Sequence, residues 1–85
     1  MKHFVYTIRD PLGIHARPAG LLVKAVKDLD SKVTLQKGDQ STSADRLLSV
    51  MGLGIRSGDT VTVTLEGGDE EANASRLLEF FEKNL

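Results

Sequence analysis

The residues best suited to chemistry in this sequence lie in one short run, GIHARPAG, which begins at Gly13. Gly13 permits a sharp change of direction before His15, and Pro18 suits the first turn of a helix, where its missing N–H would have no partner. If a helix begins near Ala16, His15 is its capping residue, and the free N–H groups of Ala16 and Arg17 lie at the positive end of the helix dipole. With the Arg17 guanidinium, these donors form an anion site beside a nucleophilic imidazole nitrogen. The run therefore predicts a phosphoryl group carried on His15.

Each of these residues also has an ordinary structural explanation. A lone histidine at a helix start is often a capping or surface residue, and Arg17 alone would usually be a solvated charge. The combination of glycine, histidine, arginine and proline in one register favours the phosphoryl interpretation. No partner carboxylate is expected near the imidazole, which suits in-line transfer that depends on positioning more than on acid–base catalysis. His3 falls on the outward face of a predicted strand, so we expect it to be an exposed bystander.

Composition excludes several classes of function. A chain of 85 residues is enough for one domain, 1–85, with a small core. It contains no cysteine and its two histidines are far apart, so we expect no disulfide, metal or other cofactor. A net charge of −1 argues against general nucleic-acid binding. No apolar run approaches the ~20 residues that cross a bilayer and no signal-peptide pattern is present, so we expect a cytoplasmic protein without direct membrane insertion.

The charges are unevenly distributed along the chain. Residues 1–56 hold nine Lys and Arg against five Asp and Glu, whereas residues 57–85 hold two against seven. The half that contains His15 is thus the positive one, as expected for a site that meets phosphorylated or acidic partners. The alternative is that a glutamate-rich helix simply happens to lie at the C-terminal end.

Apolar periodicity predicts four short strands and three helices in the order β-α-β-β-α-β-α. Strands are expected over 3–8, 31–35, 40–43 and 61–65, because apolar and polar residues alternate or β-branched residues gather there. Helical spacing over 16–27 gives a buried stripe of Ala19, Leu22, Val23 and Val26, with Leu29 just beyond. A second long helix, capped by Asp69, has the stripe Ala74, Leu77, Leu78, Phe81 and Leu85. Two amphipathic helices over one sheet indicate a two-layer α/β sandwich.

The segment 47–55, LLSVMGLGI, is unusually apolar for a short helix in so small a chain. A helix from Leu47 to about Gly52 places Leu47, Leu48 and Met51 on one stripe, and Val50 with Leu53 on another. If the second stripe faces the core, the first is exposed and forms a docking surface, where methionine suits adaptable packing. The alternative is that neighbouring loops bury all of these side chains.

The run Gly-Ile-His-Ala-Arg-Pro-Ala resembles the active-site signature of the histidine-containing phosphocarrier protein (HPr) family of the bacterial phosphoenolpyruvate-dependent sugar phosphotransferase system. The resemblance extends over essentially the whole chain and includes the short glycine-containing motifs Leu53-Gly54-Ile55 and Ser57-Gly58. It implies an α+β fold, an open-faced β-sandwich with a four-stranded antiparallel sheet and helices on one face.

The same resemblance implies a function. His15 would accept phosphate on Nδ1 from Enzyme I, with Arg17 and the N–H of Ala16 binding it, and would pass it to sugar-specific IIA proteins. Leu47, Leu48, Met51 and Gly54 would correspond to the partner-binding face. We expect a monomer that does not turn over without its partners, so whether it counts as an enzyme is left open.

One residue departs from the family pattern. In many Gram-positive relatives the position of Arg46 is a serine that a kinase phosphorylates for regulation, and arginine cannot accept that phosphate. Ser43 and Ser49 are nearby but do not occupy the matching position. We therefore expect that such a kinase does not phosphorylate this chain, and an HPr paralogue that acts mainly as a regulatory interaction protein is the alternative function.

Overall fold

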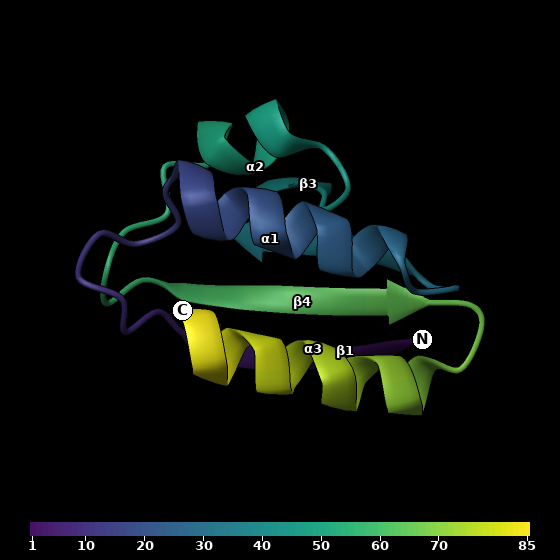
Figure 1. The fold of residues 1–85 in the computed structure, drawn as a ribbon. Helices are drawn as coiled ribbons and strands as arrows, with labels where there is room; N and C mark the ends of the chain where they lie inside the picture. Colours follow the sequence, from purple (N-terminus) through teal and green to yellow (C-terminus); the bar gives the residue numbers. More distant parts are fainter.

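The structure, a computed structural model, describes residues 1–85 as one open sheet covered on one face by helices (Figure 1). The elements are β1 (Lys2–Thr7), α1 (Ala16–Lys27), β2 (Lys32–Lys37), β3 (Gln40–Ser43), α2 (Leu47–Gly52), β4 (Thr60–Glu66) and α3 (Glu70–Asn84). The element order and the four-stranded antiparallel sheet with three helices confirm the predicted fold. The first strand begins and ends one residue earlier than predicted, and the second runs from Lys32 to Lys37 rather than from 31 to 35.

The sheet has the strand order β1-β4-β2-β3, so β4 pairs with both β1 and β2. Val63 of β4 lies opposite Phe4 of β1 on one side and Leu35 of β2 on the other. Val61, Val63 and Leu65 are buried, while the threonines between them are half-buried, as the alternation predicts. The strand that appears clearest in the sequence is thus the one that carries the centre of the core.

Helices α1 and α3 lie side by side over the sheet, and α2 lies next to α1 (Figure 1). The predicted stripe of α1 is buried, apart from Leu29, which is half-buried beyond the end of the helix. In α3 the ring of Phe81 is fully buried and meets Phe4 and Tyr6 edge-on, at centroid distances of 5.6 and 5.4 Å. These contacts fasten the C-terminal helix to the first strand, beside the loop that carries His15.

The stripe of α3 differs from the prediction at two positions. Leu78 is only half-buried, and a polar residue, Asn73, is buried instead. Asn73 is tolerated because its amide donates to Asp30 Oδ1 at 2.6 Å and to Ser31 Oγ at 2.8 Å. The Ser31 hydroxyl in turn donates to the carbonyl of Gly67 at 2.6 Å. This network joins the loop after α1 to the loop before α3.

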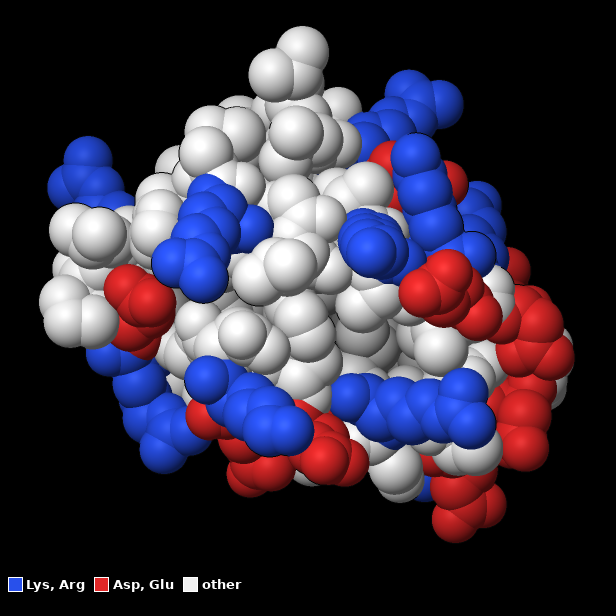
Figure 2. All heavy atoms as spheres, viewed as in Figure 1, with Lys and Arg blue, Asp and Glu red and all other residues white.

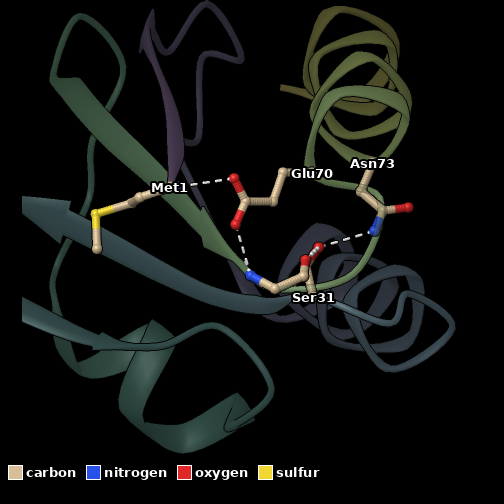
Figure 3. Close-up of polar contacts among 5 residues, drawn as sticks. Met1, Ser31, Glu70 and Asn73 are labelled. Atoms are coloured by element: carbon tan, nitrogen blue, oxygen red, sulfur yellow. Dashed lines mark hydrogen bonds and ion pairs between the residues drawn. The ribbon is translucent and has the colours of Figure 1, made fainter.

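Figure 3 shows how the neighbouring carboxylate extends this network. Glu70 accepts from the main-chain N–H of Gly67 at 2.7 Å and pairs with the N-terminal ammonium of Met1 at 2.8 Å. Asp69 caps α3, as predicted, by accepting from the N–H of Ala72. The polar network lies at the end of the molecule where α3 begins, so its role is to hold the fold.

Stability is expected to fall in acid because four carboxyl groups are held as hydrogen-bonded carboxylates. The pKa values of these four carboxyl groups are lowered, mainly because each carboxylate accepts a hydrogen bond. The donor is the side chain of Asn73 for Asp30, the hydroxyl of Ser43 for Asp45, the N–H of Arg56 for Asp59 and the N-terminal ammonium for Glu70. A lowered folded-state pKa adds stability above the unfolded value, about 4 for Asp and Glu, and that stability is lost as the pH falls below it. The melting temperature should therefore be flat from pH 7 to about 5 and decline below that.

The matched comparison for this prediction is Asp30→Asn. This variant should melt at a lower temperature at pH 7 and show a shallower decline in acid, because one of the titrating groups is gone. A parent protein whose melting temperature rises between pH 5 and 3 would contradict the assignment.

Candidate functional site

The loop that carries His15 is a tight, internally bonded turn. The carboxylate of Asp10 accepts from the N–H of Leu12 at 2.9 Å, and the Asp10 carbonyl accepts from the N–H of Gly13 at 2.9 Å. Gly13 has φ +68°, a conformation that favours glycine. Ile14 is buried and anchors the loop in the core, so His15 follows directly from a fixed point.

A second loop braces the first from behind. The N–H of Ile14 donates to the carbonyl of Ile55 at 3.1 Å, and Gly13 packs so closely against that carbonyl and Arg56 that a Cβ would collide with main-chain atoms. Lys37, at the end of β2, fixes this second loop by donating to the carbonyl of Gly54 at 2.9 Å and pairing with Asp59 Oδ2 at 3.0 Å. The His15 loop therefore rests on backbone that is itself tied to the sheet.

His15 caps α1, as predicted, with an extended backbone at φ −101° and ψ −175°. Its carbonyl accepts from the N–H of Ala19 at 2.9 Å, but its side chain makes no capping hydrogen bond. Pro18 has no N–H, so the unpaired donors of the first turn are those of Ala16 and Arg17. The half-exposed imidazole therefore makes no hydrogen bond to the helix end, and it lies at the positive end of a 12-residue helix.

A surface hollow of about 340 Å³ opens beside the imidazole. Its walls come from three parts of the chain, namely Asp10, His15, Arg17, Pro18, Leu21, Lys83 and Asn84. His15 and Arg17 share this hollow, as their spacing predicts. The turn that delivers His15 also brings Asp10 into the wall of this hollow, but the Asp10 carboxylate accepts from the N–H of Leu12 and forms no ion pair with the imidazole.

Sequence reasoning also missed the contribution of α3 to this site. Arg9 donates from Nη2 to the carbonyl of Glu82 at 3.1 Å, and the N–H groups of Arg9 and Asp10 both donate to the main-chain oxygen of Leu85. These bonds bring Lys83 to the hollow from a position 68 residues away in sequence. No local pattern signals such a long-range contact.

The short helix α2 has the two faces that the sequence predicts. Val50 and Leu53 are buried. Leu48 is 83% exposed, Leu47 is 40% exposed and Met51 is 38% exposed. Figure 2 shows uncharged atoms gathered over α2 with basic side chains around them, while acidic side chains lie mainly along the margins near α3. Gly54, at φ +62°, is exposed just after this helix.

Comparison with known proteins matches residues 2–83 to the family described as "PTS HPr component phosphorylation site". The chain belongs to the HPr family. It is 38% identical over 63 residues to the phosphocarrier protein HPr of Lysinibacillus sphaericus, covering 74% of this chain and 72% of that protein. This relative confirms the family that the GIHARPA run predicts.

Two further similarities are informative. The chain is 36% identical over 62 residues to a multiphosphoryl transfer protein of Xanthomonas campestris, covering 73% of this chain but only 7% of that much longer protein. A crystal structure of HPr from Thermoanaerobacter tengcongensis has a TM-score of 0.93 and 31% identity, covering 99% of this chain and 94% of that one. The HPr fold is therefore present over nearly the whole chain.

No helix has the length and apolar character needed to cross a membrane. No group of three or more His, Cys, Asp or Glu side chains is arranged to hold a metal ion.

Proposed function

We propose that this HPr-family chain accepts a phosphoryl group from Enzyme I on His15 and passes it to sugar-specific IIA proteins. The observation that carries the proposal is the free imidazole of His15 at the N-terminus of α1, in one hollow with Arg17. The nucleophile, the anion donors and the cation are thus supplied by His15, the N-terminus of α1 and Arg17. We further propose that the protein acts in the cytoplasm, as a monomer.

In the proposed transfer, the neutral imidazole attacks the phosphorus atom of the group carried by Enzyme I. By the family resemblance, the new P–N bond forms at Nδ1 as the bond to the donor breaks. The dianionic phosphoryl group then lies at the N–H groups of Ala16 and Arg17, where the helix dipole favours negative charge. Since no group changes its covalent state except the imidazole, the chain carries phosphate but completes no reaction without both partners.

The test of this proposal is to incubate the protein with Enzyme I and labelled phosphoenolpyruvate, and then with a IIA protein. The label should appear on the chain in an acid-labile, base-stable form, as expected for phosphohistidine, and should move to IIA. Labelling that survives acid, or a complete absence of labelling, would contradict the proposal.

Arg17 is expected to serve transfer rather than folding. It is exposed, and its side chain makes no hydrogen bond or ion pair within the chain. Arg17→Lys keeps the charge but loses the planar fork that binds phosphate in two-point fashion. Phosphotransfer should slow by about tenfold or more, since a charge-assisted hydrogen bond is worth roughly 1.5–3 kcal/mol and each ~1.4 kcal/mol is a factor of ten in rate. Circular dichroism melting should change by no more than a few degrees, and unchanged kinetics or a collapse in stability would count against this role.

The exposed face of α2 is proposed as the docking surface for Enzyme I and IIA. Leu47, Leu48 and Met51 form this face. Gly54 follows it and directly precedes Ile55, whose carbonyl accepts from the N–H of Ile14 in the His15 loop. Figure 1 shows that α2 lies beside the N-terminal half of α1, so docking there brings a partner close to the imidazole. Exposed apolar side chains surrounded by basic groups suit a partner with an apolar centre and an acidic rim.

Regulation by a serine kinase is not expected for this chain. Arg46 precedes α2 and has no hydroxyl, and its guanidinium adds positive charge where phosphoserine would add about two negative charges. When ATP and such a kinase are offered, only an Arg46→Ser variant should gain acid-stable phosphate. Acid-stable phosphate on Ser43 or Ser49 of the parent would refute this and would favour the alternative of a regulatory interaction protein.

A further inference from the structure

The hollow beside His15 contains four other polar side chains, and two of these are already engaged. The carboxylate of Asp10 accepts from the N–H of Leu12, and the amide of Asn84 donates to the carbonyl of Phe80 at 3.0 Å. The remaining two are Arg17 and Lys83. Both ion pairs of the structure lie elsewhere, at Met1–Glu70 and Lys37–Asp59, and no hydrogen bond of the chain uses the Lys83 ammonium. The hollow therefore has a second uncommitted cation.

The main chain that carries Lys83 is held firmly against the His15 loop. The main-chain oxygen of Leu85 accepts from the N–H groups of Arg9 at 2.6 Å and Asp10 at 2.8 Å. The N–H of Leu85 donates to the carbonyl of Phe81 at 2.8 Å. The Arg9 guanidinium adds a bond to the carbonyl of Glu82, the residue directly before Lys83. The last turn of α3 is thus fixed to the segment that leads into His15.

A phosphoryl group on His15 would face opposed fields from the two helices around it. The N-terminus of α1 attracts the dianion, whereas the C-terminus of α3 presents the negative end of its dipole and the carboxylate of Asp10 lines the same hollow. The ammonium of Lys83, in the last turn of α3, offsets this negative charge within the hollow that would hold the phosphoryl group.

From these observations we propose that Lys83 contacts the phosphoryl group carried on His15 and, with Arg17, forms a two-cation clamp on it. This inference rests on the proposed function, because it requires phosphate on His15. It adds a residue from α3 to the proposed phosphate-binding groups, which otherwise all lie at the start of α1. Lys83 reaches the phosphate as a flexible point charge, in contrast to the planar fork of Arg17.

The test charges the protein chemically with phosphoramidate, which phosphorylates imidazole without Enzyme I. In this reaction the P–N bond of phosphoramidate breaks, ammonia leaves, and a P–N bond to His15 forms. Lys83→Met is compared with Lys83→Arg, which keeps the charge, and with Lys27→Met. Lys27 is a matched control because it is also an exposed lysine in the last turn of a helix, but it does not line the hollow.

Two readouts are expected to change in Lys83→Met alone. The ³¹P resonance of the charged protein should titrate at a higher pH than in the parent, because a nearby ammonium favours the dianion. Transfer from the charged protein to a IIA protein should slow by about five- to tenfold, with Lys83→Arg restoring most of the rate. Melting temperatures of all variants should agree within a few degrees.

The outcomes separate this inference from the proposed function. A charged Lys83→Met protein with the ³¹P titration and transfer rate of Lys27→Met would overturn the role of Lys83 and leave the function of His15 intact. If the ³¹P shift appears but Enzyme I does not charge the parent, the clamp stands and the assignment of Enzyme I fails. If the parent takes no phosphate on His15 from either source, both are wrong.

Discussion

His15→Ala should abolish completely the acid-labile phosphorylation of the chain by Enzyme I and phosphoenolpyruvate. The reason is that His15 is the only imidazole at a helix N-terminus with free main-chain donors and a guanidinium in the same hollow. Its side chain makes no hydrogen bond that the fold requires, so the variant should retain the melting temperature of the parent within a few degrees.

His3→Ala is the matched control for this experiment. His3 lies in β1, opposite Thr64 of β4, and is exposed on the outer face of the sheet. His3 does not line the hollow that holds His15 and Arg17, so its removal should leave labelling unchanged. Mass spectrometry of the intact protein at alkaline pH would count the phosphates. Normal labelling of His15→Ala, or loss of labelling in His3→Ala, would contradict the assignment.

Gly13→Ala should be the most damaging change outside the imidazole. Gly13 has φ +68°, and a methyl group there would collide with the carbonyl of Ile55 and the Cα of Arg56, both of which are backbone. The left-handed conformation alone costs a non-glycine residue about 1–2 kcal/mol. Relief of the collision requires the His15 loop to separate from its brace, so we expect at least about 2 kcal/mol more. Transfer should fall together with stability, because the imidazole loses its fixed position.

Gly38→Ala isolates the effect of the collision. Gly38 has a similar φ of +58°, but a methyl group there would lie in open space. Since about 1 kcal/mol shifts the melting temperature of a chain of this size by about 4–8 °C, Gly13→Ala should melt roughly 10 °C or more below Gly38→Ala. Equal melting temperatures for the two variants would show that the brace does not support the His15 loop.

The features predictable from the sequence are those encoded by neighbouring residues. The bounds of α1 and α2, the capping role of His15 and Asp69, and the two faces of α2 all follow from short-range spacing and agree with the structure. The unpredicted features all depend on contacts between distant segments. Asn73 is buried only because Asp30 and Ser31 come to meet it. Lys83 reaches the hollow only because Arg9 and Asp10 hold the end of α3.

Asp10 shows that the position of a side chain near His15 in the sequence also depends on the folded loop. It is five residues from His15, and the sequence predicts only a loop there. Whether that loop directs its carboxylate toward or away from the imidazole depends on the turn closed by Gly13, whose N–H donates to the Asp10 carbonyl, and on the brace at Ile55. Spacing alone therefore does not reveal that Asp10 lies in the wall of the hollow, where the folded loop places it.

The proposed carrier function requires that the phosphoryl group is bonded to Nδ1 of His15. The most direct measurement is NMR of the ¹⁵N-labelled protein, charged with Enzyme I and phosphoenolpyruvate and kept at alkaline pH, with detection of ³¹P–¹⁵N coupling in the imidazole rings. We expect coupling to Nδ1 of His15 and none to either ring nitrogen of His3. Coupling to Nε2 of His15, to His3, or to no imidazole nitrogen of a charged protein would contradict the account.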